Sequence, residues 1–235
     1  MKMTTAAREW VKAHLPYGLS CAVARAINRP WLVDVQRVER LCEYTWALAE
    51  IGRYHEDSEP LADIGYAGGY FAEALTQFGP VTGVDPRDVP KIRHPRFHRE
   101  WPWVPEEGTY GTVVCISALE HFTYPNLAID QMLSAVHEGG QVLITVPVGP
   151  VARQFRGYRL RTLYDILEWP CMESFAVFAR RDGVWECLTA DRVDVHVTTS
   201  DATPAIIEHL PESTEHTVQA VAAVRLVRRP AVPRP

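Results

Sequence analysis

The sequence predicts an α/β protein built on a doubly wound, mostly parallel sheet with helices on both faces. Two observations support this prediction. Short apolar runs, typical of strands buried on both faces, alternate with segments of helical periodicity over residues 61–146. The first of these runs leads into a glycine-containing turn, which is how the opening unit of a nucleotide-binding sheet begins.

Composition limits the kinds of partner that we expect. The chain has 235 residues, which suits one domain with appendages, and its net charge of −5 provides no basic footprint for nucleic acid. Its five cysteines form no C-x-x-C pair, so neither a zinc cluster nor a disulfide framework is indicated. No apolar run approaches the roughly 18 residues of a membrane helix, and the N-terminus lacks the apolar core of a signal peptide. We therefore expect a cytoplasmic protein that binds neither nucleic acid nor membrane.

Residues 1–59 are expected to form a helical appendage. Two short helical patterns within residues 4–28 are separated at Pro16–Gly18, and a longer helix follows Asp34, a residue suited to an N-cap. We expect the core to span residues 60–227. The Pro- and Arg-rich tail at 228–235 is expected to be disordered.

The core elements follow from the apolar runs and the turn residues. The predicted strands, helices and hairpin are a strand at 61–63, a helix from 70 to Phe78 with Gly79 at its C′ position, strands at 81–84 and 112–117, a helix at 125–136 ended by Gly139-Gly140, a strand at 141–146, a hairpin of 175–178 with 184–187 around Asp182-Gly183, and a last strand at 218–227.

Two features of the first βαβ unit suggest a nucleotide-like ligand. Glycines at 65, 68 and 69 allow positive φ and a close approach of the backbone to a ligand, although any strand-to-helix turn can use glycine. Asp85 ends the second strand about 20 residues later, where an acid can accept the ribose hydroxyls; the alternative is a helix cap or turn former. A dinucleotide fingerprint is not favoured, because Ala67 and Tyr70 replace two of its glycines.

Four motifs in order and at family spacing resemble the class I S-adenosylmethionine-dependent methyltransferases. They read DIGYAGGYF at 63–71, GVD at 83–85, VVCISALEH at 113–121 and GGQVLI at 139–144. The match covers roughly residues 60–150, and its departure is Ala67, where the family usually has glycine. The resemblance implies a seven-stranded, Rossmann-like sheet and S-adenosylmethionine as the cofactor.

The resemblance also implies roles for single residues. Asp63 would lie behind the amino group of the cofactor, and Asp85 would bind the ribose. Glu100 would accept a hydrogen bond from the adenine amino group beside Trp101, unless the two are a solvated charge next to a core aromatic. Ser117 would lie near the methyl group, unless it is only a small spacer. The remaining residues implied to contact the cofactor are Gly65, Tyr66, Ala67, Gly68 and Pro86.

His121 is the candidate catalytic base. Methyl transfer needs an aligned acceptor and can need removal of its proton, a role that suits a nearly neutral imidazole. His121 directly follows the fourth strand of the family pattern, where family members often carry histidine. The alternative is a structural histidine that pairs with Glu120 or caps the next helix.

Two further regions could recognise the acceptor. The segment 149–161 carries Arg153, Arg156 and Tyr158, which could clamp an anionic group, although an exposed, solvated loop is the simpler interpretation. Tyr17, at the break between the N-terminal helices, could belong to a lid over the cofactor. Those helices could equally mediate homodimer contacts.

We therefore expect a methyltransferase that acts on a small molecule, most readily at a hydroxyl or carboxyl oxygen. No Asp-Pro-Pro-Tyr motif replaces Ser117–Glu120, which argues against methylation of exocyclic base amines. The acidic pattern of metal-binding catechol-type members is also missing after strands 4 and 5, so no metal is expected. The alternatives are transfer to nitrogen or carbon, a catalytically silent binding protein, and an oxidoreductase.

Overall fold

In the computed structural model of the protein, the described residues are 38–67, 69–87, 94–155, 158–181, 184–189, 193–194, 206–207, 210–213 and 218–230. Several of the expected features lie outside these ranges. They are the N-terminal helices before residue 28 with Tyr17, the cap at Asp34, Gly68, Arg156, the hairpin turn Asp182-Gly183, and residues 231–235 of the tail.

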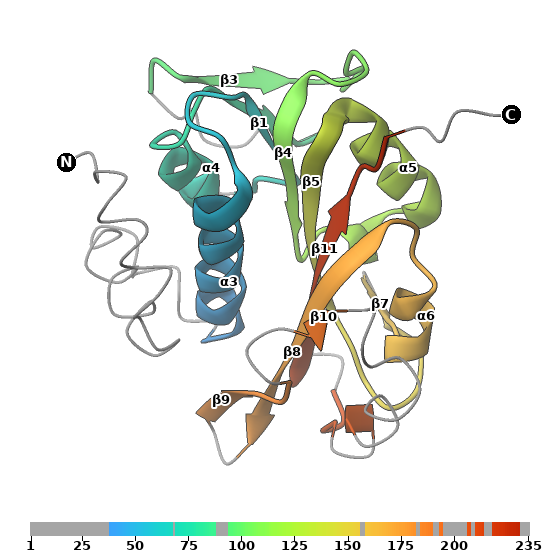
Figure 1. The fold of residues 1–235 in the computed structure, drawn as a ribbon. Coiled ribbons are helices and arrows are strands. Elements are labelled where there is room, and N and C mark those ends of the chain that lie inside the picture. The colour runs from blue at the N-terminus through green and yellow to red at the C-terminus, as the bar shows by residue number, and fades with distance from the viewer. Residues whose placement is uncertain are drawn as a thin grey trace, which may run out of the picture.

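One sheet of nine strands forms the centre of the fold, in the order β10-β8-β11-β5-β4-β1-β2-β3, with β9 also paired to β8 (Figure 1). The five strands from β1 to β5 are parallel, whereas β11 runs antiparallel between β5 and β8. The strands are β1 Leu61–Ile64, β2 Val81–Val84, β3 Phe97–Glu100, β4 Tyr110–Ile116, β5 Val136–Pro147, β8 Met172–Arg181, β9 Val184–Cys187, β10 Val193–Asp194 and β11 Ala220–Val227.

This arrangement confirms the doubly wound, mostly parallel sheet and the C-terminal antiparallel hairpin. The sheet has two strands more than the seven that we expect, because β8 pairs with both β9 and β10 in addition to β11. A separate two-stranded sheet joins β6, Arg153–Phe155, to β7, Tyr158–Leu160.

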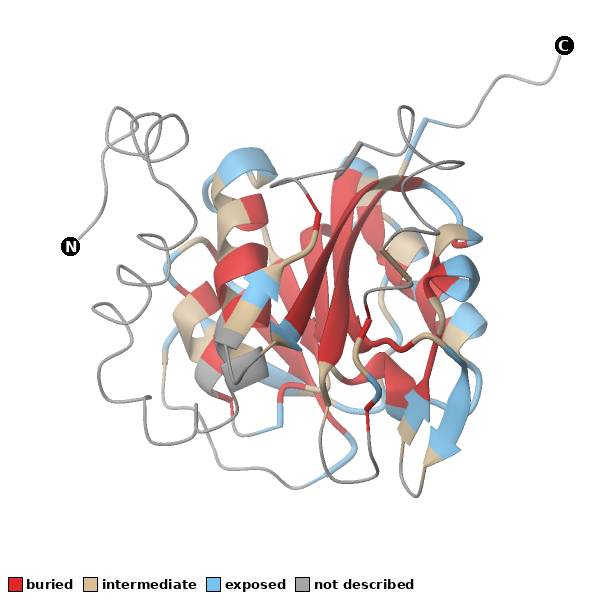
Figure 2. Cartoon of the chain, turned by 90° about the horizontal axis from the view of Figure 1, so that it is seen from below, coloured by how far each residue is buried: buried red, intermediate tan, exposed pale blue. Residues whose placement is uncertain are grey.

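Helices cover both faces of the sheet. One face carries α3, Val38–Tyr54, and α4, Tyr70–Leu75. The other carries α5, Pro125–Ala135, and α6, Leu163–Leu167 (Figure 1). The short 3-10 helix η2, Leu119–His121, also contributes Leu119 to the buried cluster of that face. Each face has its own cluster of buried apolar side chains, and Figure 2 shows the buried residues concentrated along the central strands.

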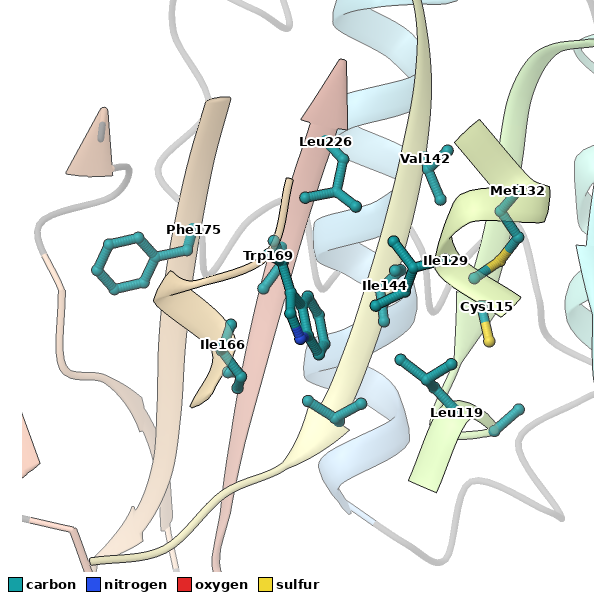
Figure 3. Close-up of a cluster of buried hydrophobic side chains, with 14 of the residues drawn as sticks. Cys115, Leu119, Ile129, Met132, Val142, Ile144, Ile166, Trp169, Phe175 and Leu226 are labelled. Atoms are coloured by element: carbon teal, nitrogen blue, oxygen red, sulfur yellow. The ribbon is translucent and has the colours of Figure 1, made fainter. Parts of the chain in front are cut away.

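The burial of β4 explains why the sequences of the central strands are continuous apolar runs. Val113 and Cys115 belong to the cluster under α5, whereas Val114 and Ile116 belong to the cluster under α3, as the two-residue period of a strand requires. Both faces of the strand are therefore buried. Figure 3 shows the first cluster, in which side chains of α5, α6, β4, β5, β8 and β11 meet.

Two helix ends differ from the expected ones. α4 ends at Leu75, because the Thr76 hydroxyl donates a hydrogen bond of 2.6 Å to the Glu73 carbonyl and the chain then turns away. Gly79 does not end a helix. Glycine is needed there because a Cβ would lie 2.1 Å from the Glu59 carbonyl oxygen. α5 ends at Ala135 and β5 begins at the next residue, so Gly139 and Gly140 lie inside a strand.

The last strand continues its pairing one residue beyond the expected end of the core. The Arg228 N–H donates to the Gly140 carbonyl, and the Arg228 carbonyl accepts from Gly139 N–H. Its side chain also donates to the carbonyls of Ser134 and Val136, both at 2.8 Å. Arg228 is therefore held against β5 and α5, although we expect it in the disordered tail.

The strand order places a crevice beside the carboxyl end of β1. The chain runs outward from β1 to β2 and β3 on one side and returns to β4 and β5 on the other. Ligands of doubly wound sheets bind at such a switch point, outside the carboxyl ends of the strands. The residues that follow β1, β2 and β4 are therefore brought together at one edge of the sheet.

Candidate active site

A cavity of about 740 Å³ opens at this edge, a size that suits a small-molecule ligand. It is referred to below as the cleft. The predicted site residues that line it are Asp63, Gly65, Tyr66, Ala67, Asp85, Pro86, Trp101, Ser117 and His121. The sequence thus identified much of the wall of one cavity from segments spread over 59 positions of the chain, from 63 to 121.

Three predicted residues within the described ranges do not line the cleft. The Glu100 carboxylate instead accepts a hydrogen bond from Val104 N–H at 3.4 Å. Arg153 pairs with Glu212 at 3.4 Å, and the Tyr158 ring packs against Phe155 with 5.0 Å between centroids. The β6–β7 hairpin therefore directs both of these side chains to partners outside the cleft.

The turn after β1 is shaped by its small residues. Gly65 has φ +77°, and a Cβ there would lie 2.5 Å from the Cβ of Ala118 on the opposite wall. Glycine is required at this position by both the conformation and the close approach. Ala67 also adopts a left-handed conformation, with φ +44°, and its N–H donates to Asp85 Oδ2 at 3.2 Å.

Asp63, in β1, is a buried acid with an unused hydrogen-bonding atom. Its side chain lines the cleft at 3% exposure, and Oδ2 has no hydrogen-bond partner among the described residues. Burial raises the pKa of Asp63 to about 7, and the nearby Asp85 adds to the effect. A cationic group that enters the cleft would compensate for both features.

Asp85, directly after β2, is equally buried but already paired. Its oxygens accept hydrogen bonds from the Arg87 side chain, from Arg87 N–H and from Ala67 N–H. Burial alone would raise the pKa of Asp85, but these hydrogen bonds and the positive charge of Arg87 outweigh it, so that the pKa is lowered. Asp85 is thus held ionised at the cleft wall.

The α3 helix contributes a polar group that we did not predict from the sequence. Arg40 lines the cleft and pairs at 3.0 Å with Glu43, whose side chain is fully buried. Glu43 Oε1 accepts hydrogen bonds from the Ser117 hydroxyl and from Thr145 Oγ1, the latter at 2.7 Å. The one signal in the sequence is that Glu43 falls between Cys42 and Trp46, in the apolar stripe of the helix.

His121 ends η2 with its side chain 56% exposed and on the cleft wall. Its Nε2 lies 3.9 Å from Glu120 Oε1, within the distance of an ion pair although longer than a hydrogen bond. It does not cap the following helix, since α5 has Tyr124 at its N-cap and no side-chain cap bond. Glu120 itself is buried, which raises its pKa to about 8.

Aromatic rings form much of the remaining wall. Tyr44 of α3 stacks on Phe71 of α4, with 4.5 Å between ring centroids. The Trp101 side chain is 56% exposed and Phe122 37%, so each presents an apolar surface to an entering ligand. The lining residues that sequence reasoning missed are Arg40, Tyr44, Phe71, Arg87, Pro102, Trp103, Phe122, Ala128, Gln131 and Met132, with Ile64, Gly69, Val84, Ile116 and Ala118 from the strand ends and turns.

The described residues contain neither a metal-binding cluster nor a membrane-spanning helix. Within them, no three His, Cys, Asp or Glu side chains are grouped closely enough to hold a metal ion. Nor does any helix of the described part combine the length and the apolar character needed to cross a membrane.

A doubly wound sheet with a glycine turn after β1, an acid after β2 and a cleft between them is the arrangement in which Rossmann-like α/β proteins bind nucleotide-like ligands. A family model described as "Methyltransferase domain" matches residues 35–181, so the chain belongs to that family. It is a class I methyltransferase that uses S-adenosylmethionine. No curated protein matches the chain in sequence.

Solved structures share the fold at low sequence identity. Phosphoethanolamine N-methyltransferase 2 of Haemonchus contortus, in complex with S-adenosyl-L-methionine, has a TM-score of 0.52 at 15% identity, covering 78% of this chain and 52% of that one. The [4+2]-cyclase SpnF has a TM-score of 0.52 at 13% identity, covering 81% of this chain and 82% of that one. Because a cyclase shares it, the fold alone does not specify the reaction.

The polar residues of the cleft are chemically suited to the groups of the methyl donor. S-adenosylmethionine presents an ammonium, a carboxylate, a sulfonium and a ribose with two hydroxyls. The unpaired oxygen of Asp63 suits the ammonium, and the ionised Asp85 suits the ribose. The wall at Gly65 has no room for a side chain, because a Cβ there would meet Ala118.

Proposed function

We propose that this methyltransferase transfers the methyl group to an oxygen atom, a hydroxyl or a carboxyl, of a small-molecule acceptor. The observation that carries the proposal is the position of His121 on the cleft wall, four residues after Ser117 at the end of β4. A partly exposed imidazole beside the reacting centre can accept the proton that a hydroxyl acceptor loses.

The charges along the cleft support one orientation of the cofactor. Arg40 and Arg87 are the cationic side chains among its described lining residues, and Arg87 is paired with Asp85 at the ribose end. Arg40 is then the partner for the methionine carboxylate, and Asp63 the partner for the ammonium. The adenine would lie beside Trp101, while Glu100 fixes the backbone of the loop that carries this ring.

The chain's own residues then act on the acceptor. The sulfonium supplies an electrophilic methyl group, whose bonding electron pair stays with sulfur as the new oxygen–carbon bond forms. His121 accepts the acceptor's proton at an imidazole nitrogen. Ser117 donates its hydrogen to Glu43, so the lone pairs of its hydroxyl are available to orient the acceptor. Positioning supplies the rest, because the reaction is a displacement between two aligned groups.

The wall around this position suits an apolar or aromatic acceptor. Tyr44 and Phe122 line the cleft together with His121, and neither adds a charge. The described residues of the basic segment 149–161 do not line the cleft, so the proposal does not require an anionic group on the acceptor.

Calorimetry and an acceptor panel test the proposal. Wild-type protein should bind S-adenosylmethionine and S-adenosylhomocysteine, and Asp85→Ala should lose both. Phenols, carboxylic acids and amines are then compared as acceptors by release of S-adenosylhomocysteine. We expect turnover on an oxygen acceptor, with loss of at least about 100-fold for His121→Ala, within the usual range for general-base catalysis. Turnover on amines alone would show that the accepting atom is nitrogen and not oxygen. Cofactor binding without turnover on any acceptor would indicate a catalytically silent binding protein.

A further inference from the structure

The carboxylate of Asp85 is saturated with hydrogen bonds from the protein itself. Oδ1 accepts from Arg87 N–H and from Arg87 Nε, both at 2.9 Å. Oδ2 accepts from Arg87 Nη2 at 2.7 Å and from Ala67 N–H at 3.2 Å. An ionised carboxylate has about four acceptor positions, so all of them are in use.

Two of these four donors are fixed in place. They are backbone N–H groups of the turns after β1 and β2, and Arg99 braces the second turn. Its Nη2 donates to the carbonyl of Arg87 at 2.8 Å and to that of Asp85 at 3.3 Å. The two hydroxyls of a ribose therefore have to take the positions held by the guanidinium, one on each carboxylate oxygen.

The guanidinium is the part that can leave. The Arg87 side chain is 66% exposed, whereas that of Asp85 is 1% exposed. Moving the guanidinium into water breaks its paired hydrogen bonds together, because the fork is rigid, and leaves the buried carboxylate with two N–H donors until the ribose hydroxyls replace the guanidinium. Moving the aspartate would disrupt the end of β2.

We propose that Arg87 is an internal competitor of the cofactor, closing the ribose position on Asp85 until its side chain swings out. This inference rests on the proposed role of Asp85 toward the ribose. Only the open form, in which Arg87 has left Asp85, can bind the ribose, so the apparent affinity falls in proportion to the population of the open form. The methyl donor and its demethylated product carry the same ribose and are affected alike. Return of Arg87 to Asp85 then assists release of the product.

Binding of S-adenosylhomocysteine to Arg87→Met tests the competition by calorimetry. Methionine keeps an apolar stem of similar length but cannot donate to Asp85. We expect binding about two- to tenfold tighter than wild type, as for charge-assisted hydrogen bonds from an exposed cation. Arg87→Lys, which can make only a single contact, should give an intermediate value.

Salt provides a second readout that does not depend on enzymatic turnover. Because Arg87 is exposed, salt screens its attraction to Asp85 in part, whereas S-adenosylhomocysteine has no net charge at neutral pH. Raising the ionic strength should therefore tighten binding to wild type and leave Arg87→Met unchanged. Arg96→Met, which removes an exposed guanidinium near the start of β2 without touching Asp85, is the matched control and should behave like wild type.

The outcomes separate this inference from the proposed function. Unchanged or weaker binding by Arg87→Met, with normal thermal unfolding, would show that Arg87 is a bystander or a cofactor ligand, and the competition would be refuted. Failure of wild-type protein to bind either sulfur compound would overturn the proposed function as well as this inference.

Discussion

The carboxyl ends of β1 and β2 lie side by side, and each carries a buried aspartate, but the two are in opposite electrostatic situations. The pKa of Asp63 is raised to about 7 and one of its oxygens is unpaired. The pKa of Asp85 is lowered, because Arg87 and two N–H groups neutralise it. The difference shows that burial alone does not fix the charge of a site; the nearest donors decide it.

The two ends therefore make different demands on a ligand. At the end of β1, the unpaired oxygen of Asp63 gains a partner when a ligand brings a cation. At the end of β2, a ligand has to replace the Arg87 side chain as the hydrogen-bond donor to Asp85. The methyl donor can meet both demands, since its ammonium and its ribose hydroxyls are carried by one molecule. Ala67 links the two ends, because it belongs to the β1 turn and donates its N–H to Asp85.

Gly65→Ala is expected to have the largest effect on this arrangement. The added Cβ would meet the Ala118 Cβ at 2.5 Å in a backbone conformation with φ +77°, so the β1 turn has to move. Overpacking and strain together cost about 3 kcal/mol, and we expect about 100-fold weaker binding of S-adenosylhomocysteine by calorimetry.

Gly52→Ala is the matched control for that substitution. Gly52 lies within α3, and no atom of another described part of the fold comes within 4 Å of the place that a Cβ would take, so alanine should fit and stabilise the helix by about 0.5–1 kcal/mol. Binding by this variant should equal that of wild type. Wild-type affinity in Gly65→Ala would mean that the turn does not contact the cofactor.

Asp63→Asn tests the raised pKa at the end of β1. If the ionised form binds the ammonium, affinity for S-adenosylhomocysteine should rise about tenfold between pH 6 and pH 8 in wild type, as a group with a pKa of about 7 loses its proton. The asparagine variant should bind more weakly, with little dependence on pH. Isothermal titration across this range, in buffers of different ionisation heat, would also detect the released proton.

The same group affects folding in a defined direction. The pKa of Asp63 is higher in the folded protein than in the unfolded chain, so the folded form retains a proton that the unfolded chain releases. Its contribution to the free energy of unfolding is fully present below about pH 4 and is lost as pH rises through about 7. Asp63→Asn should flatten this decline in denaturant unfolding, and an unchanged decline would assign it to other groups.

Arg40→Met tests the proposed partner of the cofactor carboxylate. We expect about fivefold weaker binding of S-adenosylmethionine, as for a partly exposed charge-assisted contact, and no change for the decarboxylated cofactor, which lacks the group in question. Because the substitution leaves the buried Glu43 unpaired, Arg40→Lys and thermal unfolding accompany it. Arg53→Met removes a similar pair with Glu50 on the same helix and should not affect binding. Equal losses for both cofactors would contradict the assignment.

The part of the site that could be predicted from the sequence is the part that is local along the chain. The β1 turn, Asp85 and the segment from Ser117 to His121 each follow a strand, and parallel strands bring their carboxyl ends to one edge. Their residue types and spacing were therefore sufficient to predict that they meet.

The missed part depends on contacts across the fold. Glu43 lies 74 positions from Ser117 and 102 from Thr145, and helical periodicity identifies a buried face without showing which strand end it meets. The return of the Arg87 side chain to Asp85 is a choice of rotamer, which no pattern encodes. The number of arginines in segment 149–161 suggests a clamp, but the pairing of Arg153 with Glu212 across the fold is again a contact that no local pattern predicts.

Ala67→Gly is expected to have the smallest effect. It tests the residue that connects the ends of β1 and β2, because Ala67 belongs to the β1 turn and its N–H donates to Asp85. A left-handed conformation costs alanine roughly 1 kcal/mol more than glycine, and the greater freedom of glycine in the unfolded chain offsets part of that gain. The free energy of unfolding should therefore stay level or rise by up to about 0.5 kcal/mol, whereas Ala74→Gly inside α4 should lower it by about 1 kcal/mol. Since only the N–H of residue 67 serves Asp85, affinity for S-adenosylhomocysteine should remain within twofold of wild type. A loss of stability equal to that of Ala74→Gly would show that the β1 turn is not strained at Ala67, and that its alanine is as well suited to the turn as a glycine.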